Sequence, residues 1–278
     1  MQKNQDSRLG TENITKLMIS LAIPAVLAQI VNVLYNIVDR IYIGRIPGVG
    51  AVALTGVGVT FPIITIISAF SSFASGGGAP LASIALGQGD RKRAERILGN
   101  CVSMLLFFTV ILMAFFFVFQ KPLLYVFGAS DNTIGYSSTY ISIYLLGTVF
   151  VELAVGLNTF ISAQGQARAA MFSVLIGAVV NIVLDPIFIF VFHMGVAGAA
   201  VATIISQALS AAWVLRFLCS EKSGIRLKKA GMKPDFSLIG QIMALGVSPF
   251  VMSATESAIT IVMNHGLQVY GGDLYVGS

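Results

Sequence analysis

The chain has 278 residues, of which 56% are hydrophobic and 10% charged, with a mean hydropathy of +0.87 and a formal net charge of +5. Soluble domains contain about 25% charged residues, so this composition excludes a water-soluble enzyme, a secreted disulfide-rich domain and a disordered tail. The two cysteines, Cys101 and Cys219, are too few for a metal cluster or a disulfide framework. The fold class that we predict is an all-α integral membrane protein.

Seven apolar stretches are long enough to cross a bilayer, whose hydrocarbon core of about 30 Å requires roughly 20 helical residues. They lie at approximately 16–41, 51–86, 97–119, 136–161, 170–192, 196–219 and 238–265. Short polar or glycine- and proline-containing segments separate them. None of these segments is long enough to form a soluble domain.

Basic residues are distributed unevenly between the two sides of the predicted membrane. The N-terminal segment and alternate loops contain 14 of the 17 lysine and arginine residues, whereas the opposite side has only Arg40, Arg45 and Lys121. The positive-inside rule therefore predicts a cytoplasmic N-terminus. A seven-helix receptor, whose N-terminus lies outside, is disfavoured by this orientation. The basic charge reflects topology, so we expect the bilayer and not a nucleic acid as the partner.

A shift of 225 residues aligns the first span with the seventh. It pairs Pro24 with Pro249 and Asp39 with Asn264, so a proline and a polar residue recur at the same spacing. Transporters are often built from duplicated halves, and two equal halves would give about 450 residues. We therefore predict a six-helix lobe at 1–219, a basic cytoplasmic linker at 220–237 and the first helix of a repeated C-terminal lobe at 238–278. The rest of that second lobe is then an expected partner that is missing from these 278 residues.

Ionisable side chains within a membrane span are costly and functional by default. The predicted spans contain Asp39, Glu152, Asp185 and Glu256, and no Lys or Arg lies deep enough to pair with them. Helical spacing places most of their polar neighbours on single faces. These faces are Asn32, Tyr35, Asn36 and Asp39; Asn181 and Asp185; Thr203, Ser206, Gln207 and Ser210; and Ser253, Glu256, Ser257, Thr260 and Asn264.

Hydroxyl and amide side chains on these faces have a structural alternative, because they also join membrane helices through hydrogen bonds. That alternative is weak for the carboxyl groups of Asp39 and Asp185. Two carboxylates in a low-dielectric cavity repel each other, and a bound proton or cation relieves the repulsion. We therefore expect a coupling ion, H⁺ or Na⁺, and no other cofactor. The sequence lacks G-K-[ST], H-E-x-x-H and G-x-S-x-G motifs, so we predict that the protein is not an enzyme.

Three segments resemble the MATE (multidrug and toxic compound extrusion) family. They are LGQGD at 86–90, NIVLDPIFIF at 181–190 and GVAGAAVATIISQ at 195–207. Within the family the chain is similar to the DinF/MepA-like bacterial branch. The resemblance implies two six-helix lobes around a central cavity. It also implies drug export across the bacterial cytoplasmic (inner) membrane, driven by entry of H⁺ or Na⁺.

The resemblance further implies a cation-coupling cluster in the first lobe. Its members are Tyr35, Asp39, Asn158, Asn181, Asp185 and Thr203, of which Asp39, Asp185 and Asn181 would bind the metal ion if the coupling ion is Na⁺. Glu256 resembles an acid of the NorM-like branch and joins Asn32, Asn36 and Gln207 as candidates for the substrate cavity.

The function that we expect is cation-coupled antiport of cationic amphipathic drugs by alternating access. A lipid-linked saccharide flippase is the alternative, and it predicts a cationic cavity for anionic pyrophosphate. The acids and the lack of deep Lys or Arg favour the antiporter.

Overall fold

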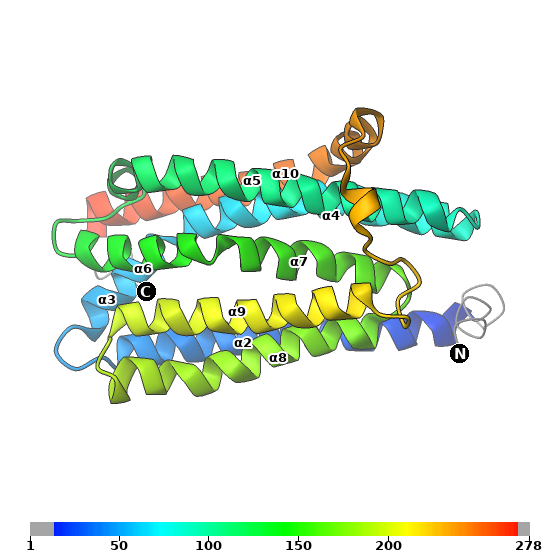
Figure 1. Cartoon of the computed structure of the whole chain (residues 1–278). Coiled ribbons are helices and arrows are strands. Elements are labelled where there is room, and N and C mark those ends of the chain that lie inside the picture. Colours follow the sequence, from blue (N-terminus) through cyan, green and yellow to red (C-terminus); the bar gives the residue numbers. More distant parts are fainter. Residues whose placement is uncertain (1–13, 272–278) are drawn as a thin grey trace.

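The computed structural model describes residues 14–271, which form a bundle of long helices (Figure 1). The α-helices are α2 (Ile14–Gly44), α3 (Gly50–Gly58), α4 (Phe61–Gly87), α5 (Arg91–Val126), α6 (Ile134–Leu146), α7 (Thr148–Ala163), α8 (Ala167–Pro186), α9 (Val196–Cys219) and α10 (Phe236–Gly271). A π-helical turn, η1 (Ile187–Val191), and a 3₁₀ turn, η2 (Lys229–Met232), complete the described part, which contains no strand. The all-α prediction is confirmed. Residues 1–13, which include Lys3 and Arg8 of the charge argument, and residues 272–278 lie outside the described residues.

Six helical segments are long and apolar enough to cross a membrane within the described residues, and a bent pair makes a seventh span. The six are Met18–Gly44, Gly50–Gly87, Arg91–Val126, Ala167–Val191, Val196–Cys219 and Phe236–Gln268. Many large apolar side chains of α2 and α10 face outward, among them Ile23, Leu27, Met252 and Val262. Such faces suit contact with lipid. The predicted number of seven is reached when the bent pair counts as one span, and the other six spans lie close to their predicted positions.

The predicted span at 136–161 is broken, whereas the sequence suggested one continuous helix. Its two parts, α6 and α7, meet at Gly147 with a bend of 62°. At Gly147 a Cβ atom would overlap the side chain of Ile204 in α9. Glycine therefore permits a close approach of α9 at the point where the helix breaks.

The helices form two groups that meet at α7. On one side α2 packs against α8, and α8 against α9; on the other side α4 packs against α5 and α10 (Figure 1). Helix α7 contacts both α4 and α9. The buried apolar residues form two clusters, one around Ile63, Phe116 and Ile141 and the other around Leu98, Leu105 and Phe160.

Helices α4 and α10 approach each other through glycines. A Cβ atom at Gly77 would overlap the main chain of Ile242, and one at Gly246 would overlap that of Phe73. Small residues allow membrane helices to pack at short distance, where van der Waals contact stabilises them. Helix α10 is therefore held closely against α4, and it also packs on α5.

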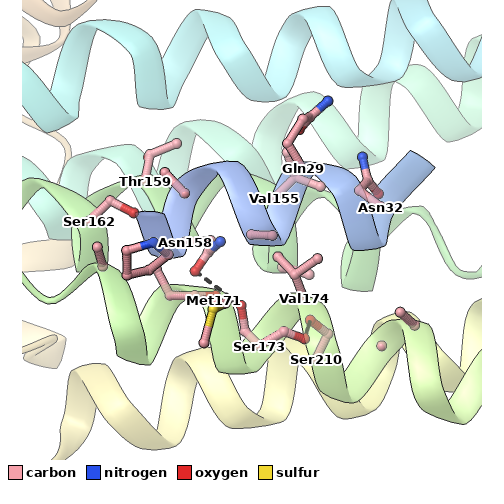
Figure 2. Close-up of a pocket in the computed structure, with 18 of the residues that line it drawn as sticks. Gln29, Asn32, Val155, Asn158, Thr159, Ser162, Met171, Ser173, Val174 and Ser210 are labelled. Atoms are coloured by element: carbon pink, nitrogen blue, oxygen red, sulfur yellow. Dashed lines mark hydrogen bonds between the residues drawn. The ribbon is translucent and has the colours of Figure 1, made fainter. Parts of the chain in front are cut away.

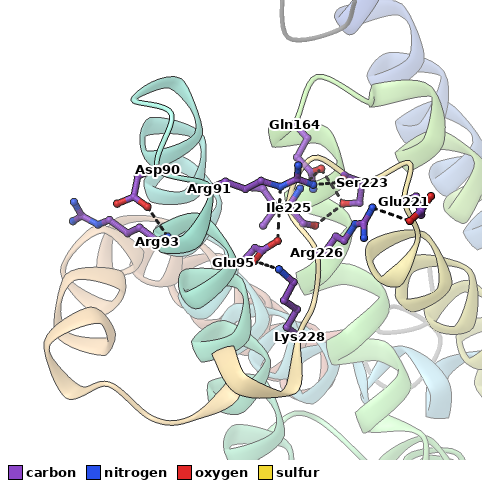
Figure 3. A network of polar contacts seen from close by, with 10 residues as sticks. All are labelled: Asp90, Arg91, Arg93, Glu95, Gln164, Glu221, Ser223, Ile225, Arg226 and Lys228. Atoms are coloured by element: carbon purple, nitrogen blue, oxygen red, sulfur yellow. Dashed lines mark hydrogen bonds and ion pairs between the residues drawn. The ribbon is translucent and has the colours of Figure 1, made fainter. Parts of the chain in front are cut away.

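The segment between α9 and α10 is bound to the bundle by polar contacts (Figure 3). Lys228 Nζ donates to Glu95 Oε2 at 2.6 Å, and Arg96 pairs with Asp235. Gln164 Oε1 accepts from Ser223 Oγ and from the Ile225 amide, both at 3.0 Å. This segment coincides with the predicted linker at 220–237. The division of the chain into two lobes stays a prediction.

Candidate cation and substrate site

Two buried carboxyl groups face each other between α2 and α8. Asp39 and Asp185 lie side by side, and Asp185 is fully buried. Asn181, one turn earlier on α8, donates its amide N–H to Asp185 Oδ1 at 3.1 Å. Within residues 14–271, Asp39 Oδ1, Asp185 Oδ2 and Asn181 Oδ1 are buried and lack a hydrogen-bond partner. Three unsatisfied oxygens in one place are suited to a proton or an oxygen-seeking cation.

The local sequence explains why Asp185 lies at this place. Ser173, Asn181 and Asp185 follow one another at multiples of four residues, so they share one face of α8. Pro186 ends the α-helix, because proline has no N–H to continue the hydrogen-bond ladder. The chain goes on as the π-helical turn Ile187–Val191. Such turns occur frequently at functional sites.

No basic side chain of the described residues lies within 4.0 Å of either carboxyl group. Arg40 follows Asp39 directly, but its guanidinium group lies over the Phe61 ring, 4.5 Å from the ring centroid. A buried charge without a partner is strongly disfavoured. The pair is therefore a candidate site for a proton or a cation.

Two tyrosines act electrostatically on the carboxyl pair, and a threonine and a third tyrosine lie next to them. Tyr35 of α2 is in electrostatic contact with Asp39 and Asp185. The Tyr140 phenol lies beside the Thr203 hydroxyl and in electrostatic contact with Asp39. Tyr140 and Tyr144 stack with a centroid distance of 6.3 Å. The structure thus brings together five of the six residues predicted for the coupling cluster, namely Tyr35, Asp39, Asn181, Asp185 and Thr203.

Sequence reasoning missed Tyr140 and Tyr144. Both are buried on α6, and their spacing of four residues places them on one face of that helix. This spacing was the available signal. It could not be interpreted without knowing that α6 faces α2 and α9 at this level.

A cavity of about 360 Å³ adjoins the cluster and is enclosed by α2, α7, α8 and α9 (Figure 2). Its polar lining includes Gln29, Asn32, Tyr35, Asn158, Thr159, Ser162, Ser173, Ser206, Gln207 and Ser210, and its apolar lining includes Ala154, Val155, Met171 and Val174. Tyr35 belongs to both the cavity wall and the carboxyl cluster. A ligand in the cavity would therefore lie next to the carboxyl pair.

Asn158 belongs to the cavity, whereas the sequence analysis grouped it with the aspartates. Its Oδ1 accepts a hydrogen bond from Ser173 Oγ at 3.0 Å. Ser173 precedes Asn181 by two turns of α8, which is about 12 Å along the helix axis. Asn158 thus points to a different level of the bundle from Asn181 and Asp185.

The four substrate-cavity candidates divide into two pairs. Asn32 and Gln207 line the cavity. The Asn36 amide instead donates to the Asn32 main-chain oxygen at 2.7 Å. Glu256 is exposed on α10, which packs on α4 and α5. Neither Asn36 nor Glu256 is among the described residues that line this cavity.

Comparison with known proteins gives a consistent picture. The MatE family profile matches residues 24–187. The multidrug export protein MepA of Staphylococcus haemolyticus (strain JCSC1435) is 27% identical over 259 residues, which cover 93% of this chain and 57% of the relative. The structure of the MATE multidrug transporter DinF-BH in complex with rhodamine 6G is 37% identical, with a TM-score of 0.92, over 97% of this chain and 60% of that one. The chain spans about three fifths of the length of these relatives.

Proposed function

Because the chain belongs to the MATE family, whose relatives are efflux transporters and not enzymes, we propose that it forms the first lobe of a cation-coupled multidrug antiporter. The proposed substrates are cationic amphipathic drugs, and the proposed coupling ion is H⁺ or Na⁺. The single observation that carries this proposal is the carboxyl pair of Asp39 and Asp185, which adjoins the cavity through Tyr35.

The arrangement supports exchange of a cation for a cationic drug. When the carboxyl pair is ionised, its negative potential favours a positively charged drug in the adjoining cavity. When a proton or Na⁺ binds to the pair, that potential falls, so the affinity for the drug falls as well. Such reciprocal weakening is negative cooperativity, an unfavourable (positive) coupling free energy between two sites. Alternation of the cavity between the two membrane faces would convert this coupling into antiport.

The gradient of the coupling ion can supply the energy. Exchange of one monovalent cation for one monovalent drug moves no net charge, so the membrane potential contributes only when more than one ion enters for each drug. Each net charge that moves through 100 mV then releases about 2.3 kcal/mol. This corresponds to roughly a 50-fold concentration ratio of drug, since about 1.4 kcal/mol equals a factor of ten.

The flippase alternative gains no support from the cavity. A pyrophosphate-binding cavity requires basic groups, and no Lys or Arg is among the described residues that line this one.

Replacement of each carboxyl group tests the proposed function, with the rhodamine dye of the DinF-BH complex as the transported probe. Asp39→Asn and Asp185→Asn should each lower transport of this dye into everted membrane vesicles, which corresponds to efflux from cells, at least tenfold under an imposed H⁺ or Na⁺ gradient, applied separately. Asp131→Asn removes an exposed carboxyl group outside the cluster and should retain normal efflux. Undiminished efflux by both cluster variants would exclude the pair from coupling.

The proposed location is the bacterial inner membrane with a cytoplasmic N-terminus. Cys219 is exposed at the end of α9, whereas Cys101 is buried and serves as an internal control. A membrane-impermeant maleimide should label Cys219 in everted vesicles and not in intact cells. Labelling in intact cells would reverse the proposed orientation.

A further inference from the structure

A second buried acid lies outside the site described above. Glu152 of α7 is fully buried, and both of its carboxyl oxygens lack a hydrogen-bond partner within residues 14–271. None of the ion pairs found in this part of the chain involves Glu152. Its main-chain oxygen accepts from Ser71 Oγ of α4 at 3.3 Å. The carboxyl group itself remains without any partner that would explain its burial.

A second unsatisfied polar group lies at the same level of the bundle. Thr109 of α5 is 3% exposed, and its hydroxyl group also lacks a partner among the described residues. Leu105 Cδ1 lies 2.8 Å from the position of a Cβ at Gly156, and α5 and α7 run antiparallel (Figure 1). One turn forward along α5 and one turn back along α7 lead to Thr109 and Glu152. Helical register thus places two unsatisfied groups opposite each other.

Three helices enclose this place. Ser71 Oγ of α4 lies 3.0 Å from the same Cβ position at Gly156, so α4 lies against α5 and α7 there. Ser71, Thr109 and Glu152 form a polar group, which we call the Glu152 site. It is built on α4, α5 and α7, whereas the carboxyl pair is built on α2 and α8.

Tyrosines connect the two places electrostatically. Tyr144 of α6 is in contact with Glu152 and with Tyr35, and Tyr35 is in contact with Asp39 and Asp185. Among the described residues, Tyr144 is the titratable group in contact with Glu152, and α4 and α5 contribute the uncharged Ser71 and Thr109. Tyr35 and Tyr144 therefore lie between the two places, and no charged side chain of the described residues acts on Glu152 directly.

We propose that Glu152 is a second proton-binding group of this lobe, which holds a proton at the Glu152 site and exchanges it with water during the transport cycle. An ionised carboxylate without a cation or hydrogen-bond donor is strongly disfavoured in an apolar interior. The protonated group is neutral and supplies an O–H donor for one bound water molecule, which can also bond to the Thr109 hydroxyl. The bend at Gly147, five residues before Glu152, is where a movement of α7 against α6 would admit water.

The claim that Glu152 holds a proton is independent of the proposed antiport. The claim that this proton is exchanged during transport rests on the proposed antiport and extends it. Infrared spectroscopy of the purified protein tests the presence of the proton. One absorption band of a protonated carboxyl group should disappear in Glu152→Gln and persist in Asp131→Asn. In Thr109→Val, which removes the neighbouring hydroxyl, the same band should shift. An unchanged spectrum in both Glu152→Gln and Thr109→Val would overturn the proposal, and the Thr109→Val shift decides if the Gln variant does not fold.

Proton counting tests the exchange. Addition of the rhodamine dye to weakly buffered wild-type protein should release protons, detected with a pH indicator, and Glu152→Gln should release about one proton fewer because one binding group is lost. An unchanged count would overturn the exchange. If wild-type protein neither binds the rhodamine dye nor releases protons, the proposed antiport fails instead. In that case, the infrared band of Glu152 is followed during a pH titration. A band that disappears while the protein stays folded supports proton exchange, and a band that persists until the protein unfolds excludes it.

Discussion

Asn181 donates a hydrogen bond of 3.1 Å to Asp185 one turn later on α8, and both side chains are buried. The bond fixes Asp185 Oδ1. The other carboxyl oxygen, Asp185 Oδ2, and the side-chain oxygen of Asn181, Oδ1, have no hydrogen-bond partner in the described residues. An amide that donates through nitrogen therefore presents its oxygen to the same space as the free carboxyl oxygen. This pairing orients two potential ion ligands with a single hydrogen bond.

Removal of this amide should weaken binding of the coupling ion. Asn181→Ala loses a hydrogen bond to a buried carboxyl group and one oxygen ligand, a change of about 1–3 kcal/mol. We expect roughly a tenfold higher ion concentration for half-maximal displacement of the bound rhodamine dye. Asn132→Ala removes an exposed amide in the connection between α5 and α6 and should leave this concentration unchanged. Equal ion dependence of Asn181→Ala and wild type would contradict a ligand role for Asn181.

Helix α10 should separate from α4 when a methyl group is added at Gly77. In Gly77→Ala the new atom overlaps the Ile242 main chain, which cannot rotate away as a side chain could. Overpacking of this kind costs about 1–3 kcal/mol, so thermal unfolding in detergent should begin several degrees lower. Gly87→Ala, in the same helix, meets nothing within 4 Å and should be neutral or slightly stabilising, since alanine favours helix. Equal melting of the two variants would disprove the close packing.

The contact between Asp235 and Arg96 should make attachment of the linker depend on pH. Hydrogen bonds from the Leu238 and Ser237 amides, with Arg96 nearby, hold the pKa of Asp235 below its usual range. Because the folded-state pKa is lowered, the stabilisation is complete above the unfolded-state value of about 3.9 and disappears as pH falls through the folded-state pKa.

The variant Asp235→Asn keeps a side-chain oxygen for the helix N-terminus and loses the ion pair. Its melting temperature should lie below that of wild type at neutral pH, and the difference should shrink as pH falls below about 4. If the difference in melting temperature between the variant and wild type grew as the pH fell, the ion pair between Asp235 and Arg96 would not be its cause.

The buried side chain of Gln164 should control access of proteases to the linker. It accepts two hydrogen bonds from the linker and donates a third to the Phe160 main-chain oxygen at 3.0 Å. Loss of these bonds in Gln164→Leu should lower the cost of local opening by more than about 1.4 kcal/mol. Trypsin should then cleave the linker at least tenfold faster, at sites such as Arg226 and Lys229.

Gln166→Leu provides the matched control for this experiment. Gln166 makes one exposed hydrogen bond, from its amide to the Lys222 main-chain oxygen at 2.8 Å. The control should be cleaved at a rate close to that of wild type. Equal rates for the two leucine variants would show that the Gln164 bonds do not hold the linker.

The spans could be predicted from the sequence because their length and hydropathy are properties of each segment alone. The same holds for polar faces, so the pattern Asn181–Asp185 indicated one side of α8 before any neighbour was known. The break at Gly147 could not be predicted in this way. It depends on the contact with Ile204 of α9, which is distant in the sequence.

Contacts between helices account for the other differences. Asn158 and Asn181 were grouped by residue type and resemblance, and their distance became evident only from the hydrogen bond between Asn158 and Ser173. The opposition of Thr109 and Glu152 requires the register of α5 against α7. Periodicity within one helix contains no information about the register between two helices.

The attachment of the linker and α10 has a consequence for the order in which the chain assembles. The contacts of the linker at Glu95, Arg96 and Gln164, and those of α10 at Phe73 and Gly77, are all with residues that the ribosome has already made. Helix α10 can therefore dock as soon as it emerges, without waiting for any residue that follows it. A polypeptide paused once α10 has left the ribosomal exit tunnel should already protect the linker from trypsin, so any residues made afterwards would start from a fixed position and orientation.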